Sequence, residues 1–139
     1  MDDRYKLQRF VDAQNPVIEQ VRAELGRGRK TGHWIWFIFP QIEGLGSSET
    51  ARYFAISSRE EAETYLAHPV LGPRLRECSR LVARVQGKSV DQIFGYPDNL
   101  KFQSCMTLFA QATTENEVFL EALNMYFGGE LDQQTLDQM

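Results

Sequence analysis

Residues 71–85 read LGPRLRECSRLVARV and carry the clearest helical pattern of the chain. The apolar side chains recur at spacings of four and three residues, and they are Leu71, Leu75, Cys78, Val82 and Val85. At 100° per residue these positions fall within about 40° of one line, which predicts an amphipathic helix. Three arginines, at positions 76, 80 and 84, fall on the opposite face, where we expect solvent.

Similar spacing recurs through the chain and predicts further short helices. They cover residues 4–14, 16–25, 48–54, 58–67, 98–109 and 114–127, with single turns at 89–94 and 132–138. Helix starts are indicated by residues that favour caps, namely Asn15, Ser48, Ser58, Ser89, Asp98 and Thr114. The apolar run from Trp34 to Phe39 fits either a buried strand or a short buried helix. Since one strand cannot form a sheet, the sequence predicts an all-α fold of about seven or eight short helices.

Length and composition are those of one globular domain over residues 1–139. The chain has a mass of 16.0 kDa, with 42% hydrophobic and 24% charged residues, which argues against disorder. It starts MDDRYK, without the basic start and apolar run of a secretory signal. Its longest apolar run has six residues, whereas a membrane span needs about 20. We therefore expect a cytoplasmic protein that is not in a membrane.

The cysteines and histidines give little sign of a metal or redox centre. Cys78 and Cys105 are far apart in sequence and form no Cys-x-x-Cys motif, so we expect two reduced, buried thiols. The two histidines, His33 and His68, are too few for a histidine-rich site. The sequence therefore predicts no metal site and no cofactor.

The charge of the chain is unevenly distributed. The net charge is −4, but residues 1–100 hold 14 basic and 13 acidic side chains, whereas residues 101–139 hold one basic and six acidic. A net-acidic chain without a broad basic stripe is a poor candidate for nucleic-acid binding. Residues 22–30 are the exception, because four basic side chains there face one acidic side chain.

This basic stretch leads into the segment with the most unusual composition. Six aromatic side chains lie from Trp34 to Phe54, four before and two after the glycine-rich loop Gly44-Leu45-Gly46-Ser47-Ser48. Two tryptophans at positions i and i+2 of a helix diverge by about 200°, so we expect one of them at a surface or groove. The loop precedes a predicted helix and can cradle an anion; the alternative is an ordinary loop with a serine cap.

These patterns suggest a pocket for a small anionic, nucleotide-like ligand, with rings stacking on the base and basic groups holding phosphate. The candidate ligand-binding residues are Arg29, Lys30, Trp34, Trp36, Gln41, Gly44, Gly46, Ser47, Ser48, Arg74 and Lys101. The candidate acid–base residues are His33, Glu49 and His68, although His68 can instead cap a helix. Lys101, Ser104 and Thr107 share one helix face, for which we favour solvent over a pocket wall.

Several long motifs resemble a known family. They are GHWIWFIFPQ at 32–41, GLGSS at 44–48, YLAHPVLGPRL at 65–75, IFG at 93–95, Lys101 with SCMTLF at 104–109, and YFGG at 126–129. Together they resemble the signature of a bacterial family called domain of unknown function 1810. The resemblance implies a compact, single-domain, all-helical fold and no particular activity. Some members carry the label calpastatin, which does not suit this composition because inhibitors of that kind are disordered.

Two classes of function follow from these observations. The first is a pocket protein, either a binder or an enzyme, for a nucleotide-like ligand such as ADP-ribose. The second is a non-catalytic interaction module or homo-oligomer whose exposed aromatic side chains form an interface. The residues leave open which of the two applies, and whether the chain is an enzyme.

Overall fold

The computed structural model describes residues 3–139, so Met1 and Asp2 of the charged N-terminal stretch lie outside the described part. These residues form helices and no strand. The helices are α1 (Gln8–Gln14), α2 (Ile18–Arg27), α3 (Ile35–Ile38), α4 (Glu49–Tyr53), α5 (Arg59–Ala67), α6 (Leu71–Ala83), α7 (Val90–Phe94), α8 (Asp98–Ala112), α9 (Glu117–Phe127) and α10 (Gln133–Gln138). The all-α prediction is confirmed. The described residues hold more helices than predicted because four helices are only four to six residues long.

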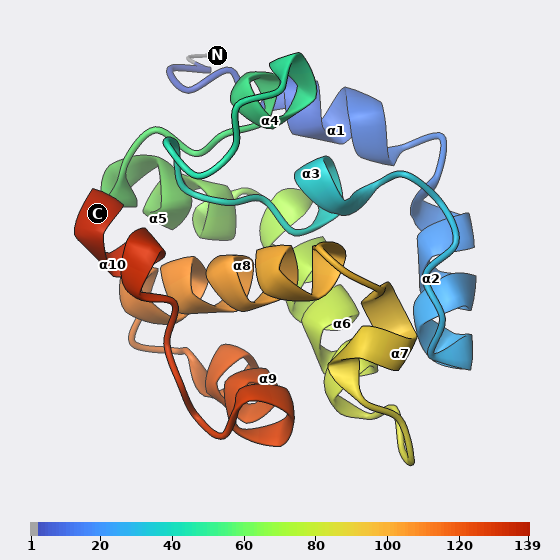
Figure 1. Cartoon of the computed structure of the whole chain (residues 1–139). Helices are drawn as coiled ribbons and strands as arrows, with labels where there is room; N and C mark the ends of the chain where they lie inside the picture. The colour runs from blue at the N-terminus through green and yellow to red at the C-terminus, as the bar shows by residue number, and fades with distance from the viewer. Residues whose placement is uncertain (1–2) are drawn as a thin grey trace.

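Helix α8 is the central element of the fold (Figure 1). It packs against α3, α5, α7, α9 and α10, and ten of its fifteen residues are buried. A helix that is apolar on several sides is stable only when it is covered on those sides. This explains why α8 contains buried residues as different in position as Phe102, Cys105 and Phe109. The N-terminal half of α8 is not covered on every side, and its residues 100–104 form one wall of the candidate site.

Helix α6 has the buried apolar face that the spacing of its residues predicts. Leu71, Leu75, Cys78 and Val82 are all buried, and the helix packs against α2, α5 and α9. Arg80 and Arg84 are exposed, as predicted. Arg76 differs, because it is half-buried, donates to the backbone oxygen of Glu115 over 2.7 Å and lies over the ring of Phe119.

The aromatic run forms a single helical turn, which settles the ambiguity between strand and helix. In α3, Ile35 and Ile38 are buried, as are the flanking Trp34 and Phe39. Trp36 is half-buried, so the two tryptophans do diverge as their spacing requires. After α3 the chain runs extended and forms an isolated parallel bridge between Ile42 and Ile56.

Three of the predicted caps are confirmed and three are wrong. Asn15 does not cap α2, which begins only after Val17. The hydroxyls of Ser48, Ser58 and Ser89 each accept a backbone N–H three residues on. Asp98 is the first residue of α8 but forms ion pairs with Lys30 and Lys101 instead of capping the helix. Thr114 does not cap α9, which begins only after Asn116. The residues between α8 and α9 form a loop instead, in which the Thr113 hydroxyl accepts the N–H of Glu115 and the Asn116 amide donates to the Ala110 oxygen.

Two further observations concern the chain as a whole. Within residues 3–139 no helix is both long and apolar enough to cross a membrane. Cys78 and Cys105 are free and buried, as predicted. Burial raises the pKa of Cys78 to about 12 and also raises that of Cys105, so both thiols stay protonated and unreactive near neutral pH.

Candidate functional site

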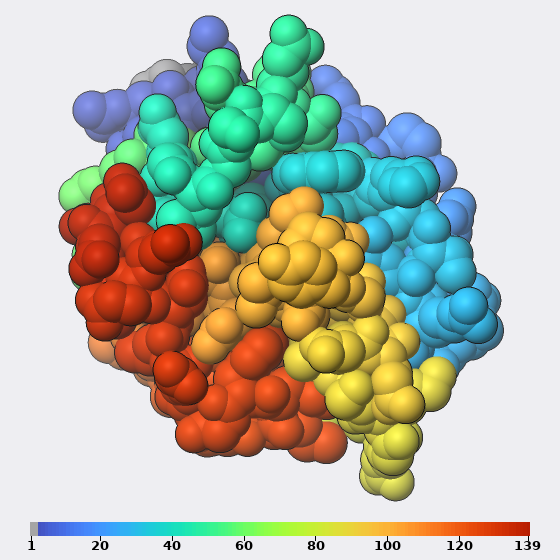
Figure 2. Space-filling view, in the orientation of Figure 1, coloured from blue at the N-terminus to red at the C-terminus, as the bar shows by residue number. Residues whose placement is uncertain are grey.

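Two adjoining cavities open on the face formed by residues 41–54, the start of α8 and the C-terminal segment. Figure 2 shows this hollow between the green, orange and red parts of the surface. The inner cavity has a volume of about 150 Å³ and the outer groove about 540 Å³. The two cavities share four of their lining residues, which are Trp36, Gln41, Gly46 and Ala51. A ligand can therefore occupy both cavities while contacting Trp36.

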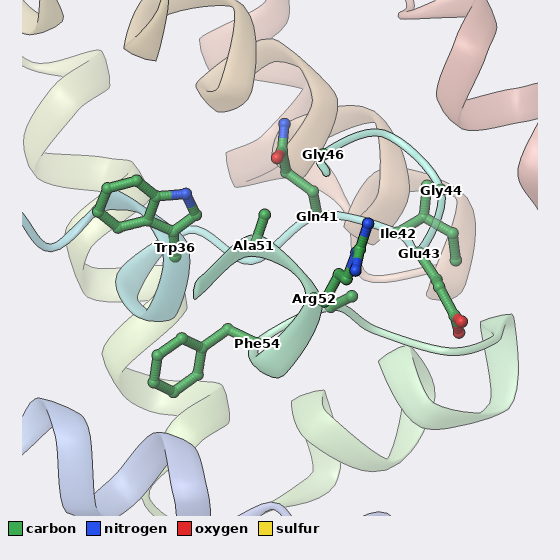
Figure 3. A pocket seen from close by; sticks show the side chains of 10 residues that line it. Trp36, Gln41, Ile42, Glu43, Gly44, Gly46, Ala51, Arg52 and Phe54 are labelled. Atoms are coloured by element: carbon green, nitrogen blue, oxygen red, sulfur yellow. The ribbon is translucent and has the colours of Figure 1, made fainter. Parts of the chain in front are cut away.

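The inner cavity lies between α3, α4 and the extended chain after α3. Its apolar lining comes from Trp36, Ile42, Ala51, Phe54 and Ala55. Its polar lining comes from Gln41, Glu43 and Arg52. In Figure 3 the Trp36 and Phe54 rings lie on one side of α4, while the Glu43 carboxylate points away from Trp36. The cavity thus combines an aromatic wall with a few polar groups, as small-molecule sites do.

Gly46 permits the close approach of the glycine-rich loop to α4. A Cβ at Gly46 would lie 2.6 Å from the Cβ of Ala51, closer than non-bonded carbon atoms come in proteins. The loop therefore rests on α4 at the junction of the two cavities. Helix α4 itself has five residues, and the Ser48 hydroxyl takes the N–H of Ala51. The loop thus shapes the cavity, and its role as an anion cradle stays a prediction.

The outer groove brings residues from three distant parts of the chain together. Ser47 and Ser48 come from the glycine-rich loop, Lys101 and Ser104 from α8, and Gln134 from α10. Lys101 is the positive charge of this groove, and its ammonium lies 4.8 Å from the centre of the Trp36 ring. This is the geometry of a cation–π contact.

Lys101 is available for a ligand because Lys30 neutralises the nearest carboxylate. The Lys30 ammonium is 2.8 Å from Asp98, whereas that of Lys101 is 3.4 Å from the other oxygen of Asp98. Only 7% of the Lys30 side chain is exposed, and its ammonium also donates to the Gly32 oxygen over 2.5 Å. One carboxylate therefore serves two ammonium groups, so the cluster of Lys30, Asp98 and Lys101 has a net charge of +1, beside a groove that the Asp132 carboxylate also lines.

The polar face of α8 does not point to solvent, so the solvent interpretation of Lys101, Ser104 and Thr107 is wrong. Ser104 and Thr107 are buried beneath the C-terminal segment, which they bind. The Ser104 hydroxyl donates to the Asp132 carboxylate over 2.9 Å, and the Thr107 hydroxyl accepts the N–H of Asp132 over 2.9 Å. These bonds place α10 as a wall of the outer groove.

The basic loop before α3 is held in place by a carboxylate that the sequence alone does not single out. Glu24 is 1% exposed, and one of its oxygens accepts the N–H groups of Thr31, Gly32 and the Trp34 indole over 2.7–3.0 Å. Trp34 is thereby a core residue with a satisfied N–H group. Arg29 is exposed, and neither it nor Lys30 lines the two cavities.

The remaining candidate residues do not converge on the cavities. His33 and Glu49 are exposed and do not line either cavity. Arg74 instead donates to the buried side chain of Gln14 over 3.3 Å. The structure thus groups Trp36, Gln41, Gly44, Gly46, Ser47, Ser48 and Lys101 around one hollow. The acid–base roles of His33, Glu49 and His68 stay predictions, and these three side chains are not brought together.

His68 binds the start of α6. Its Nδ1 accepts the N–H groups of Val70 over 3.1 Å and Leu71 over 3.2 Å, and its backbone oxygen accepts the N–H of Gly72 over 3.1 Å. The His68 side chain therefore caps the N-terminus of α6, which follows it, and not the C-terminus of α5, which precedes it.

We expect His68→Ala to lower the free energy of unfolding by about 1 kcal/mol, because two N–H groups lose their acceptor. His68→Asn places an oxygen where Nδ1 lies and is expected to restore most of this loss. Urea denaturation of the two variants measures the difference. An asparagine variant as unstable as the alanine variant would contradict the capping role.

Some lining residues were missed in the sequence because they acquire a role only through folding. Arg52, Phe54 and Asp132 are ordinary residues of predicted helices or turns. Asp98 was predicted only as a cap, although its place three residues before Lys101 is compatible with an ion pair on one helix face. That spacing is the one signal in the sequence from which its contact with Lys101 could have been found.

The fold and the divided cavity define an all-α protein with a ligand-sized groove beside its central helix. The chain belongs to the family described as "Protein of unknown function (DUF1810)", whose model matches residues 4–139. It is similar to the crystal structure of the conserved hypothetical protein Rv1873 from Mycobacterium tuberculosis, with 54% sequence identity and a TM-score of 0.98. The match covers 99% of this chain and 98% of that one. No curated protein matches the chain.

Proposed function

We propose that the chain binds a small anionic, nucleotide-like ligand, such as ADP-ribose, in the two adjoining cavities. The observation that carries this proposal is the junction at Trp36, which lines both cavities and lies beside the Lys101 ammonium. A planar ring against Trp36 gains stacking, and an anionic group gains the charge of Lys101. Arg52 adds a second positive charge at the inner cavity and has no ion pair among residues 3–139.

Binding is measurable through the two tryptophans, because only one of them lines the cavities. Trp34 is 1% exposed and bonded to Glu24, so ligands do not reach it, whereas Trp36 is half-buried at the cavity junction. We expect ADP-ribose or a nucleoside monophosphate to quench the tryptophan fluorescence and to raise the melting temperature. Trp36→Ala is expected to weaken binding about tenfold or more, since stacking on one base contributes about 1–3 kcal/mol.

The matched control is Trp36→Phe, which keeps an aromatic wall. It is expected to bind within a fewfold of the wild type in calorimetric titrations while losing most of the fluorescence change. Equal affinity in wild type and Trp36→Ala would contradict the proposal. So would the absence of any stabilisation by ADP-ribose and by the nucleoside monophosphates.

A second candidate function is an interaction module, which is supported by exposed apolar side chains near the same groove. Tyr53 is 60% exposed, Tyr96 80% and Leu100 46%. Tyrosine is frequent among the residues that anchor protein interfaces. A concentration-dependent dimer in sedimentation that is lost in Trp36→Ala, without nucleotide binding, would favour this alternative.

A further inference from the structure

We infer that the inner cavity selects a single-ring base, so that the ligand is a pyrimidine nucleotide with its phosphate at Lys101. This inference rests on the proposed function and narrows its ligand class to pyrimidine nucleotides, so ADP-ribose, whose base is a purine, becomes a weak ligand. Its basis is the difference in size, charge and polarity between the two cavities that meet at Trp36.

The size of the inner cavity favours one six-membered ring. A cavity of about 150 Å³ holds one benzene molecule, and the inner cavity has this volume. Its walls at Ile42, Ala51 and Phe54 are apolar and suit the faces of a flat ring. The fused double ring of a purine is larger, so it must either stay partly outside or displace α4.

The polar groups of the inner cavity suit the edge of a base better than a phosphate. Gln41 accepts the N–H of Ile56 through its backbone oxygen, and its side-chain amide, which offers both a donor and an acceptor, lines the cavity. The edge of a pyrimidine presents the complementary pair of groups. Glu43 also lines this cavity, and its negative charge offsets the positive charge of Arg52, so the cavity offers a phosphate no net charge.

The outer groove in turn suits the phosphate. Asp98 binds Lys30, and the hydroxyls of Ser104 and Thr135 hold Asp132, which keeps its negative charge. Lys101 is the positively charged side chain that lines this groove. With the ring against Trp36 and the phosphate at Lys101, the ribose spans the junction between the cavities.

Calorimetric titration of the full chain with UMP, CMP, AMP and GMP tests this selectivity. We expect UMP and CMP to bind at least tenfold more tightly than AMP and GMP. Uridine, which lacks the phosphate, is expected to bind about tenfold more weakly than UMP. Lys101→Gln should remove this advantage of UMP over uridine, whereas Arg80→Gln, an exposed position on α6, should keep it.

A second variant tests the inner cavity directly. Ala51→Leu fills it and is expected to abolish the preference for pyrimidines, while Thr50→Leu, at an exposed position of the same helix outside the cavities, should keep that preference. Circular dichroism melting checks that both variants fold. Binding of AMP or GMP as tight as, or tighter than, that of UMP and CMP overturns the inference. If Trp36→Ala still weakens the binding of these purine nucleotides, the proposed function stands. If none of the nucleotides binds, both proposals fail.

Discussion

Glu24→Gln is expected to lower the free energy of unfolding by about 3 kcal/mol at pH 7, although it changes only one atom and one charge. Burial by itself would raise the pKa of Glu24, but hydrogen bonds from Gly32, Thr31, Gln20 and Trp34 outweigh burial and lower it to about 2. The ordinary value is 4.5, and each unit of difference between the folded and unfolded chain corresponds to about 1.4 kcal/mol.

The stabilisation by Glu24 depends on pH in a direction that follows from its lowered pKa. Because the pKa of Glu24 is lower in the folded chain, the stabilisation is fully present above the unfolded value. It is lost as the pH falls from about 5 to about 2, since the folded chain must then accept a proton. We therefore expect the wild type and Glu24→Gln to differ most at neutral pH and to converge near pH 2. Urea denaturation between pH 7 and pH 2 measures this convergence.

The matched control is Glu19→Gln on the same helix. The Glu19 side chain is 84% exposed and pairs with Arg22 at the surface, so its loss should cost less than about 1 kcal/mol. In Glu24→Gln the amides of Thr31 and Gly32 should also exchange hydrogen faster, because their acceptor is no longer charged. A loss of stability no larger than that of Glu19→Gln would show that Glu24 does not hold the loop.

Much of the helical architecture could be predicted from the sequence because it depends on local patterns. The spacing in α6 indicated the buried face that Leu71, Leu75 and Val82 do form. The cap at Ser89 was equally local, since it bonds Gln92 three residues on. The cap predicted at Thr114 is wrong because the Asn116 side chain donates to the Ala110 oxygen at the end of α8, and α9 begins only after Asn116. This contact joins two elements and is not a local signal.

The candidate site was predicted only in part for a similar reason. Trp36 and the glycine-rich loop are close in sequence, and their composition marked them as a group. Lys101 enters the same groove from a helix about sixty residues later, and whether it faces solvent depends on which segment covers α8. Lys30 is basic and lies near the aromatic run, but the proximity of Asp98 in space makes it a structural residue.

Gly72→Ala is expected to cost about 3 kcal/mol or more, against the general preference of helices for alanine. Gly72 is buried in the first turn of α6, where the chain has just left α5. A Cβ there would lie 2.9 Å from the carbonyl carbon of Leu66 and closer still to its oxygen. Since these are backbone atoms, no side-chain rotation relieves the clash, and α5 and α6 must move apart.

Gly26→Ala is expected to have the opposite effect, an increase in the free energy of unfolding. Gly26 lies in α2, and a Cβ there would meet no atom within 4 Å, so alanine should stabilise the helix by up to about 1 kcal/mol. Thermal and urea unfolding of both variants therefore separate the contact at Leu66 from the intrinsic effect of removing a glycine. If Gly72→Ala also stabilised the chain, the close packing of α5 on α6 would be refuted, because helix propensity alone would then decide both positions.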